Sequence, residues 1–196
     1  MYLVGLDEVG RGCIAGSVIA AAVILLPDLE WQGELTDSKK LTPTKRTRLA
    51  TLICEQSVAW AIGRAEATEI DRINILQASL LAMTRAVRAL PVKPDRAVVD
   101  GNRCPALDCP GEAIIRGDAL IPVISAASIL AKVVRDQEMD VLDSLFPGYG
   151  FSRHKGYPTE LHRQSLRTLG ASPVHRMSFR PVRAVTLSIN FAHDHD

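Results

Sequence analysis

Short runs of apolar residues, separated by polar or glycine-rich stretches, are the main pattern along the chain and predict buried strands. These runs occupy residues 2–4, 17–26, 58–63, 96–99 and 113–115. The first three are expected to form an antiparallel meander. The fourth follows a long helical segment, and a crossover of that kind predicts parallel pairing. The pattern therefore predicts an α/β fold.

Four stretches have the features of helices that would cover this sheet. Residues 45–54 follow Thr42 and Pro43, which suit the cap and the first turn of a helix. Apolar side chains recur at spacings of three and four from 67 to 89, where Asn74 could interrupt or cap the helix. Two more helices are expected at residues 121–145 and 158–169.

Proline and glycine at 147–150 mark the expected end of the main domain. We expect this domain over residues 1–150, a small basic helical subdomain over 151–183, beginning as a loop at 151–156, and a frayed tail over 184–196. The subdomain carries seven Lys and Arg residues against one acidic residue, although the chain has a net charge of only +1. This asymmetry favours contact with a polyanion, and a solvated helical surface is the alternative.

The composition is that of a globular protein with one good core: 196 residues, 47% hydrophobic and 23% charged. No apolar stretch is long enough for a signal peptide or a spanning helix, so a cytoplasmic protein without membrane contact is expected. Four scattered cysteines show no disulfide framework, which suits a reducing compartment. Zinc is disfavoured, because Cys104 and Cys109 lack a second ligand pair at zinc-finger spacing.

Two adjacent acids, Asp7 and Glu8, stand where the first predicted strand ends. Burying both carboxylates costs free energy through desolvation and mutual repulsion, and a divalent cation would offset both. Because neighbouring side chains of a regular strand point to opposite faces, the two can converge only if the strand breaks, which Gly10 and Gly12 would permit. The alternative is a hairpin tip with solvated charges. A dinucleotide-binding loop is disfavoured, because the glycine spacing misses that fingerprint and a strand pattern follows.

Two further acids are expected at the same edge of the sheet. Asp100 closes the fourth strand and Asp118 follows the fifth, and sites in open α/β sheets gather at the carboxyl ends of strands. Oxygen ligands without nearby Cys or His favour Mg²⁺ or Mn²⁺ over zinc. Two such ions could activate a water and stabilise a leaving oxygen, which favours phosphoryl transfer. Asp136 is expected to pair with Arg135 or a helix cap rather than to join this cluster.

Several motifs occur together in a fixed order: GLDEVGRG at 5–12, DSKKL at 37–41, NIL at 74–76, VDG at 99–101, GD at 117–118, SAASILAKVVRD at 125–136 and HKGYPT at 154–159. In these motifs residues 3 to about 183 resemble ribonuclease HII, the bacterial type 2 ribonuclease H. The resemblance implies a ribonuclease H-like fold, with a five-stranded mixed sheet flanked by helices and a small helical C-terminal subdomain. It also implies an endoribonuclease that hydrolyses the RNA strand of RNA/DNA hybrids. Incision 5′ to a single ribonucleotide in duplex DNA, with 3′-hydroxyl and 5′-phosphate ends, is implied as well.

The resemblance also assigns roles to individual residues. It implies a set of catalytic acids that bind two Mn²⁺ or Mg²⁺ ions, namely Asp7, Glu8, Asp100 and Asp118. The loop Gly10, Arg11 and Gly12 corresponds to the one that reads the 2′-hydroxyl through its backbone, which agrees with the close approach that glycine permits. Tyr157 corresponds to a tyrosine that packs against the nucleotide at the ribose-to-deoxyribose junction, where an aromatic surface is independent of base identity. Phosphate contacts are expected from Lys39, Lys40, His154, Lys155 and Arg176.

Two positions, Cys13 and Ser17, depart from the family's usual proline. The loop after the glycines is therefore expected to be less rigid, and Cys13 could make activity sensitive to thiol oxidation. Rival interpretations are another nuclease of the same fold, such as a Holliday-junction resolvase, and a nucleic-acid-binding module without catalysis. A monomer is expected, and the sequence leaves open whether residues 184–196 contact a sliding clamp.

Overall fold

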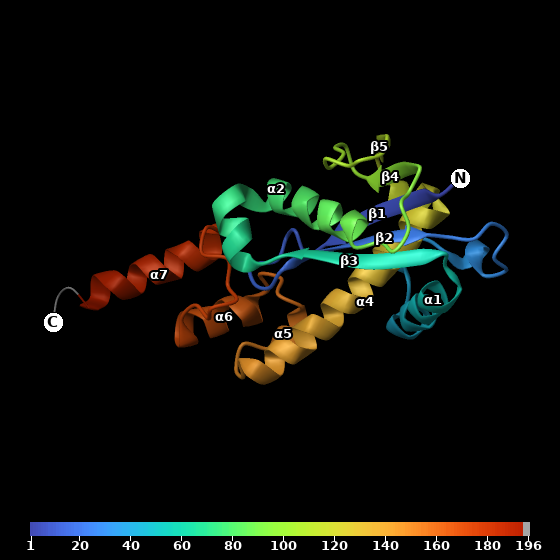
Figure 1. Cartoon of the computed structure of the whole chain (residues 1–196). Helices are drawn as coiled ribbons and strands as arrows, with labels where there is room; N and C mark the ends of the chain where they lie inside the picture. Colours follow the sequence, from blue (N-terminus) through green and yellow to red (C-terminus); the bar gives the residue numbers. More distant parts are fainter. Residues whose placement is uncertain (194–196) are drawn as a thin grey trace.

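A mixed sheet of five strands forms the centre of the protein, which a computed structural model describes over residues 1–193 (Figure 1). The strands are β1 Leu3–Val9, β2 Val18–Ile24, β3 Ala59–Ala65, β4 Arg96–Asp100 and β5 Gly111–Ile114. Their order across the sheet is β3-β2-β1-β4-β5. β1, β2 and β3 pair antiparallel as predicted, whereas β4 pairs parallel to β1 and β5 parallel to β4. The expected five-stranded mixed sheet is confirmed.

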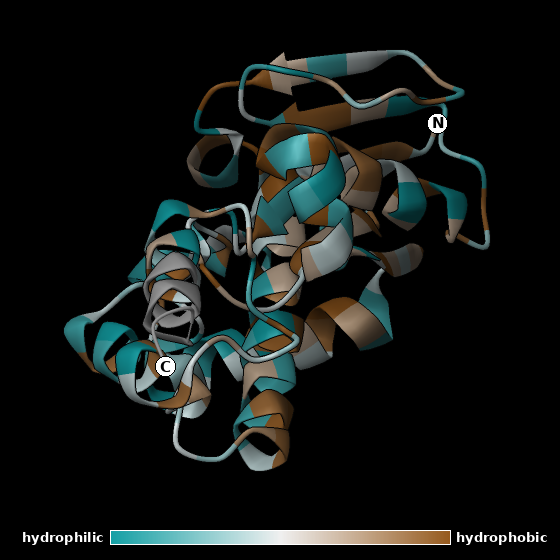
Figure 2. Cartoon of the chain, turned by 90° about the vertical axis from the view of Figure 1, so that its left-hand side faces the viewer, coloured by the Kyte–Doolittle hydropathy of each residue, from teal (hydrophilic) through white to brown (hydrophobic). Residues whose placement is uncertain are grey.

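Helices cover both faces of the sheet (Figure 1). α2, Ala67–Arg88, lies on one face, and α1, Pro43–Gln56, and α4, Pro122–Leu145, lie on the other. Every residue of β2 is buried, because alternate residues such as Ile19 and Ala20 pack toward opposite helical layers. Figure 2 shows hydrophilic and hydrophobic positions alternating along the helices, as expected when one face of each helix is buried.

Two glycines let helices lie directly against strands. A Cβ on Gly5 of β1 would stand 2.3 Å from the carbonyl oxygen of Val123 in α4. A Cβ on Gly63 of β3 would stand 2.0 Å from the carbonyl oxygen of Ala82 in α2. Since both obstacles are backbone atoms, a side chain at either position would have to displace a helix. These glycines therefore set the spacing of the layers that carry the site.

α2 consists of two helical segments joined at Asn74, whose φ of 67° and ψ of 165° are not helical. The Asn74 Oδ1 accepts hydrogen bonds from the backbone N–H groups of Leu76 at 3.0 Å and Gln77 at 3.2 Å. Asn74 therefore both interrupts the first segment and caps the second, which are the two roles that the sequence suggested. The second segment lines a pocket that also contains Glu8 and Asp100.

The remaining elements connect the sheet to the C-terminal part of the chain. They are η1 Gln32–Glu34, η2 Ser38–Lys40, α3 Gly117–Leu120, α5 Phe151–His154, α6 Glu160–Leu169 and α7 Arg180–His193. The loop expected over 151–156 contains one helical turn, since Gly150 and Lys155 flank it with left-handed φ values. The frayed tail expected over 184–196 is instead helical up to residue 193, and the last three residues lie outside the described part. Within residues 1–193, no helix is long and apolar enough to cross a membrane.

The segment 151–183 lies against the loop that follows β1. The Ile14 backbone N–H donates to the Gly156 carbonyl at 2.9 Å, and the Ile14 carbonyl accepts from the Arg176 backbone N–H at 2.9 Å. The loop 10–17 is thus held between the sheet and the C-terminal part of the chain. This placement brings basic and aromatic residues of that part close to the acidic end of β1.

Candidate active site

The acidic pair of β1 lies inside a continuous strand. Asp7 and Glu8 pair in register with Ala21 and Ala20 of β2, and β1 continues for one residue beyond them. The expected strand break at this pair is therefore wrong, because the glycines begin only after the pairing ends. Side chains alternate along the strand, so Asp7 faces α4, where Ser128 lies close enough to lower the pKa of its carboxyl, and Glu8 faces α2.

The end of β4 brings the third and fourth acids to the same edge of the sheet. β4 is parallel to β1 and ends at Asp100, which lies close enough to Asp7 and Glu8 to repel both carboxylates. Asp118 of α3 donates its backbone N–H to Asp100 Oδ1 at 3.3 Å. The Ser125 hydroxyl of α4 donates to the Asp118 carbonyl at 2.7 Å and holds α3 in place. Asp100 is thus the acid that connects the other three.

Burial and mutual repulsion raise the pKa of three of these acids. Asp7 is 6% exposed, and burial, followed by the charges of Glu8 and Asp100, holds its pKa well above the usual value. Burial also raises the pKa of Glu8, although the Arg11 guanidinium lowers it. The pKa of Asp118 is raised by burial and then by Asp100. In these three acids the effect of burial and repulsion exceeds that of the nearby cations.

The donor atoms of this cluster fit a divalent cation. Carboxylate oxygens are the ligands that Mg²⁺ and Mn²⁺ prefer, and a cation would offset the desolvation and repulsion of the acids. Among residues 1–193, no three His, Cys, Asp or Glu side chains are already arranged as a metal-binding group. The fold therefore gathers the acids at one edge without closing them around an ion.

The loop after β1 presents backbone next to these acids. Gly10 has a φ of 97°, and a Cβ there would stand 2.6 Å from Nε of Arg135, so the position requires glycine. Arg11 is exposed, and its guanidinium pairs with the Glu8 carboxylate at 3.1 Å. The backbone groups of Gly12 have no hydrogen-bond partner within the described residues. Two consecutive exposed residues thus follow a buried glycine at the end of the acidic strand.

Tyr157 lies beside this loop, and its ring is 3.7 Å from the position that a Cβ on Gly12 would take. The side chain is half-exposed, and burial is the main cause that raises the pKa of its phenol. The charge of Lys39, on η2, is close enough to lower the pKa of both Tyr157 and Asp118. Lys40 is exposed on the same turn, η2.

The chain as a whole matches a known family. A family model described as Ribonuclease HII matches residues 4–182. The chain belongs to the ribonuclease HII family. It is 64% identical to the Ribonuclease HII of Methylococcus capsulatus over 181 residues, covering 92% of this chain and 93% of that protein. It is 59% identical to the Ribonuclease HII of Nitrosococcus oceani over 179 residues, covering 91% and 89%.

A solved structure shows the same fold over almost the whole chain. The ribonuclease H2 from Pyrococcus horikoshii is 25% identical, with a TM-score of 0.81 and coverage of 97% of this chain and 99% of that one. Ribonucleases HII are endoribonucleases that act on RNA/DNA hybrids, and the ribonuclease H family uses divalent metal ions. This chain is therefore a hydrolase of that class.

Two expected phosphate contacts of this ribonuclease HII are interior residues instead. His154 is 7% exposed, its Nδ1 accepts from the Gly156 N–H at 3.2 Å, and its Nε2 donates to the Tyr149 carbonyl at 2.9 Å. Arg176 is fully buried, and its guanidinium donates to backbone carbonyls of the loop 10–17. Because neither side chain reaches the surface, we correct both assignments to residues that support the site from beneath.

The other charged candidates near α4 pair with one another. The Lys155 ammonium pairs with the Asp140 carboxylate and donates to the Asp136 carbonyl at 3.2 Å. The Asp136 carboxylate pairs with Lys132 at 2.5 Å and with Arg46 at 3.6 Å. Asp136 therefore pairs with these two cations instead of the expected Arg135, and the ammonium of Lys155 is paired within the protein.

Two supporting residues on α4 were not identified from the sequence. Ser128 lies close enough to lower the pKa of Asp7, and Arg135 lies under Gly10 with almost no exposed surface. The signal that could have found them is the presence of a serine and an arginine on the sheet-facing side of an otherwise apolar helix. Helical spacing predicts which side of the helix faces the sheet, but it does not predict which residues Ser128 and Arg135 meet there.

Cys13 is fully buried, and its thiol donates to the Lys155 carbonyl at 3.4 Å. An oxidant in solution therefore has no direct route to the sulfur in the folded protein. The burial argues against the expected sensitivity of activity to oxidation at this residue.

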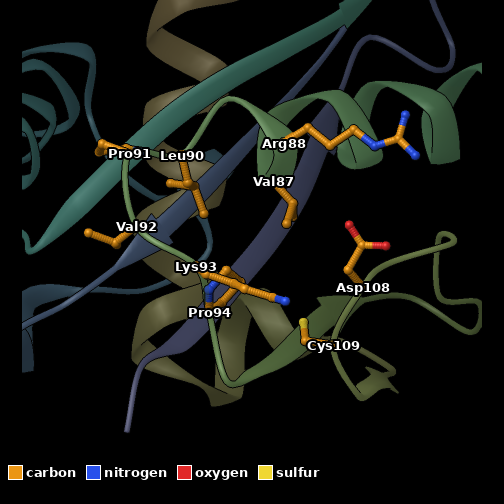
Figure 3. A pocket seen from close by; sticks show the side chains of 9 residues that line it. All are labelled: Val87, Arg88, Leu90, Pro91, Val92, Lys93, Pro94, Asp108 and Cys109. Atoms are coloured by element: carbon orange, nitrogen blue, oxygen red, sulfur yellow. The ribbon is translucent and has the colours of Figure 1, made fainter.

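A separate pocket of 320 Å³ lies at the other end of the sheet (Figure 3). Figure 3 shows Val87 and Arg88 at the end of α2, the linker residues 90–94, and Asp108 with Cys109 facing them. β4 begins after the residues of this pocket and ends at Asp100, so the length of the strand separates the pocket from the acids. The pocket shares no residue with the proposed active site.

Three buried histidines form a cluster beneath Tyr157. The rings of His154 and His162 stack with centroids 4.1 Å apart, and Nε2 of His162 lies 3.0 Å from Nε2 of His175. One of these two nitrogens must donate and the other accept, so the two rings cannot both be positively charged. Burial lowers the pKa of His162 and of His175 to about 4.

We expect the protein to lose stability progressively as the pH falls from about 6.5 toward about 4. The pKa of both rings is lower in the folded protein, so the unfolded chain binds more protons in this window. The full free energy of unfolding is therefore present above about pH 6.5. As the pH falls toward about 4, each ring is expected to reduce it by on the order of 3 kcal/mol. Thermal unfolding midpoints measured against pH test this, and His162→Asn should flatten the dependence. An equal slope in the variant would contradict it.

Proposed function

We propose that this ribonuclease HII incises duplex DNA on the 5′ side of a single embedded ribonucleotide, in addition to cutting the RNA strand of hybrids. We further propose that the products carry 3′-hydroxyl and 5′-phosphate ends. The proposed catalytic acids are Asp7, Glu8, Asp100 and Asp118. Gly10, Arg11, Gly12 and Tyr157 are the proposed readers of the ribonucleotide.

The observation that carries the proposal is the juxtaposition of the acidic edge with an exposed glycine backbone and an aromatic ring. Gly12 has no side chain, and its backbone groups have no partner among residues 1–193, so the sugar of a nucleotide can approach it closely. A 2′-hydroxyl both donates and accepts hydrogen bonds, which matches a free N–H beside a free carbonyl. The half-exposed ring of Tyr157 lies next to Gly12 and offers a flat surface to a sugar or base of any identity.

The four acids would hold two Mg²⁺ or Mn²⁺ ions, which when bound would supply an activated water and stabilise the leaving oxygen. Asp100 connects the acids on β1 with Asp118, so one substrate phosphate could be placed against all of them. Arg11 pairs with Glu8 and limits the repulsion within the cluster. Lys39 is a proposed phosphate contact, because its charge acts on both Asp118 and Tyr157.

The test offers the wild-type protein three substrates of matched sequence with Mg²⁺ or Mn²⁺. These are a DNA duplex with one ribonucleotide, the same duplex without it, and a four-way DNA junction. We expect cleavage of the first substrate only, at one position 5′ to the ribonucleotide. The products should be ligatable without prior treatment with a kinase, because the downstream fragment would carry a 5′-phosphate.

Cutting of the junction with no preference for the ribonucleotide would favour a resolvase instead. An RNA/DNA hybrid of the same sequence is the positive control for the family activity. Its cleavage without incision at the single ribonucleotide would leave that activity intact and contradict the proposed specificity.

A further inference from the structure

Two buried arginines lie together under the glycine loop without a carboxylate partner. Arg135 of α4 and Arg176, which precedes α7, are 2% and 0% exposed. Among the residues that the structure describes, neither guanidinium has an Asp or Glu within salt-bridge distance. Two buried charges so close to each other repel, which lowers the pKa of Arg176 to about 10 after the larger effect of burial. Burying two neighbouring positive charges costs free energy, so other interactions of the two guanidinium groups must offset that cost.

The loop carbonyls provide the compensation for Arg176. Its Nε donates to the Gly16 carbonyl at 3.0 Å, and one terminal nitrogen donates to the carbonyls of Arg11 at 3.2 Å and Cys13 at 2.6 Å. The other terminal nitrogen donates to the Ser17 carbonyl at 3.1 Å. The planar guanidinium therefore holds four carbonyls of one short loop at fixed separations.

Arg135 holds the same loop from the α4 side. It donates to the carbonyl of Ser17, which Arg176 also binds, to that of Ala15 at 3.1 Å and to that of Lys155 at 3.2 Å. The last bond reaches the residue two positions before Tyr157. The two arginines thus fix the loop and the start of the tyrosine segment in one network.

The network leaves a specific part of the loop free. The carbonyls of Arg11 and Cys13 are occupied, whereas the N–H groups of Arg11 and Gly12 have no acceptor within residues 1–193. Hydrogen bonds that order a loop before binding reduce the entropy lost when a ligand is bound. Loop carbonyls held by buried cations also leave more positive potential at the exposed N–H groups.

We propose that Arg135 and Arg176 are positioning residues that hold the loop 10–17 by its carbonyls, so that the N–H groups of Arg11 and Gly12 remain free for the ribonucleotide. This inference rests on the proposed function of the loop. It assigns the two arginines no contact with the substrate.

The test compares Arg176→Lys with Arg88→Lys, an exposed arginine at the pocket on the other end of the sheet. A lysine has one nitrogen and cannot span the four carbonyls. In metal-free buffer, we expect Arg176→Lys to bind the duplex with one ribonucleotide about 10-fold more weakly. Its affinity for the all-DNA duplex should stay within about 2-fold of the wild-type value. Arg88→Lys should match the wild type on both duplexes.

Amide hydrogen exchange provides a second measurement that does not depend on the variant folding. In the wild type, the Ile14 and Gly16 amides should exchange slowly and the Gly12 amide fast. Exchange of all three at the same fast rate would overturn the inference. In Arg135→Lys, the Ile14 and Gly16 amides should exchange faster than in the wild type.

The two proposals fail in different ways. If the wild type does not distinguish the two duplexes, the proposed function fails. If the wild type distinguishes them and a folded Arg176→Lys does so equally well, the positioning role is wrong.

Discussion

Asp7→Asn is expected to lower kcat on a duplex with one ribonucleotide by about 10³-fold or more, without lowering the thermal stability of the metal-free protein. The substitution removes a carboxylate charge from the proposed metal site while keeping the shape of the side chain. Burial raises the pKa of the Asp7 carboxyl, so its charged form destabilises the folded protein above the pKa of the unfolded chain. A neutral amide removes this cost, and the unfolding midpoint should be unchanged or higher at neutral pH. Steady-state kinetics and calorimetry measure the two effects.

Metal binding provides a readout of the same site that does not depend on turnover. Added Mg²⁺ or Mn²⁺ should raise the unfolding midpoint of the wild type, because an ion that binds only the folded state stabilises it. The increase should be absent or much smaller in Asp7→Asn. Asp108→Asn, an exposed carboxylate of the distant pocket, is the matched control and should behave as the wild type. Full activity in Asp7→Asn, with an undiminished effect of the ions, would show that this acid does not hold them.

Gly5→Ala is expected to destabilise the fold by about 3 kcal/mol or more. Its Cβ would stand 2.3 Å from the Val123 carbonyl oxygen and 2.7 Å from the Ile124 nitrogen, so the start of α4 would have to move away from β1. α4 carries Ser128 and Arg135, and the same displacement should therefore also disturb Asp7 and the glycine loop. Urea unfolding of the variant and the wild type gives the difference in free energy.

Gly33→Ala is the matched control, because a Cβ at Gly33 would meet no atom within 4 Å. Its free energy of unfolding should lie within about 1 kcal/mol of the wild-type value. Gly63→Ala should repeat the large effect on the other face, where the obstacle is the Ala82 carbonyl of α2. Equal stabilities of Gly5→Ala and Gly33→Ala would mean that the contact between β1 and α4 can relax at little cost.

Local sequence signals predicted the elements of the fold well. Thr42 and Pro43 marked the start of α1, and the Thr42 side chain accepts a hydrogen bond from the Lys45 N–H at 3.3 Å. Gly170 ended α6 with a φ of 75°, as a left-handed residue at a helix end does. These signals depend on backbone preferences of a few neighbouring residues, and the sequence states them directly.

Expectations about side-chain direction were less accurate. The strand was expected to break at Asp7 and Glu8, but β1 stays paired through both residues. Their side chains point to opposite faces of the sheet, and Asp100 of the neighbouring strand β4 lies close to both carboxylates. His154 and Arg176 were expected to contact phosphate because they belong to the basic segment 151–183. Their burial depends on where residues from distant parts of the chain pack, and a motif does not record this.

The sequence by itself determined the strands and helices, the chemical nature of the acids and the family to which the chain belongs. It could do so because periodicity, turn residues and motifs are properties of short stretches. Only the tertiary structure decided which acids meet and which basic side chains are interior. It alone placed two arginines beneath the glycine loop with no carboxylate partner among residues 1–193. The contacts of these arginines join residues more than 100 positions apart, such as Arg135 with Ala15 and Arg176 with Gly16, and only packing creates them.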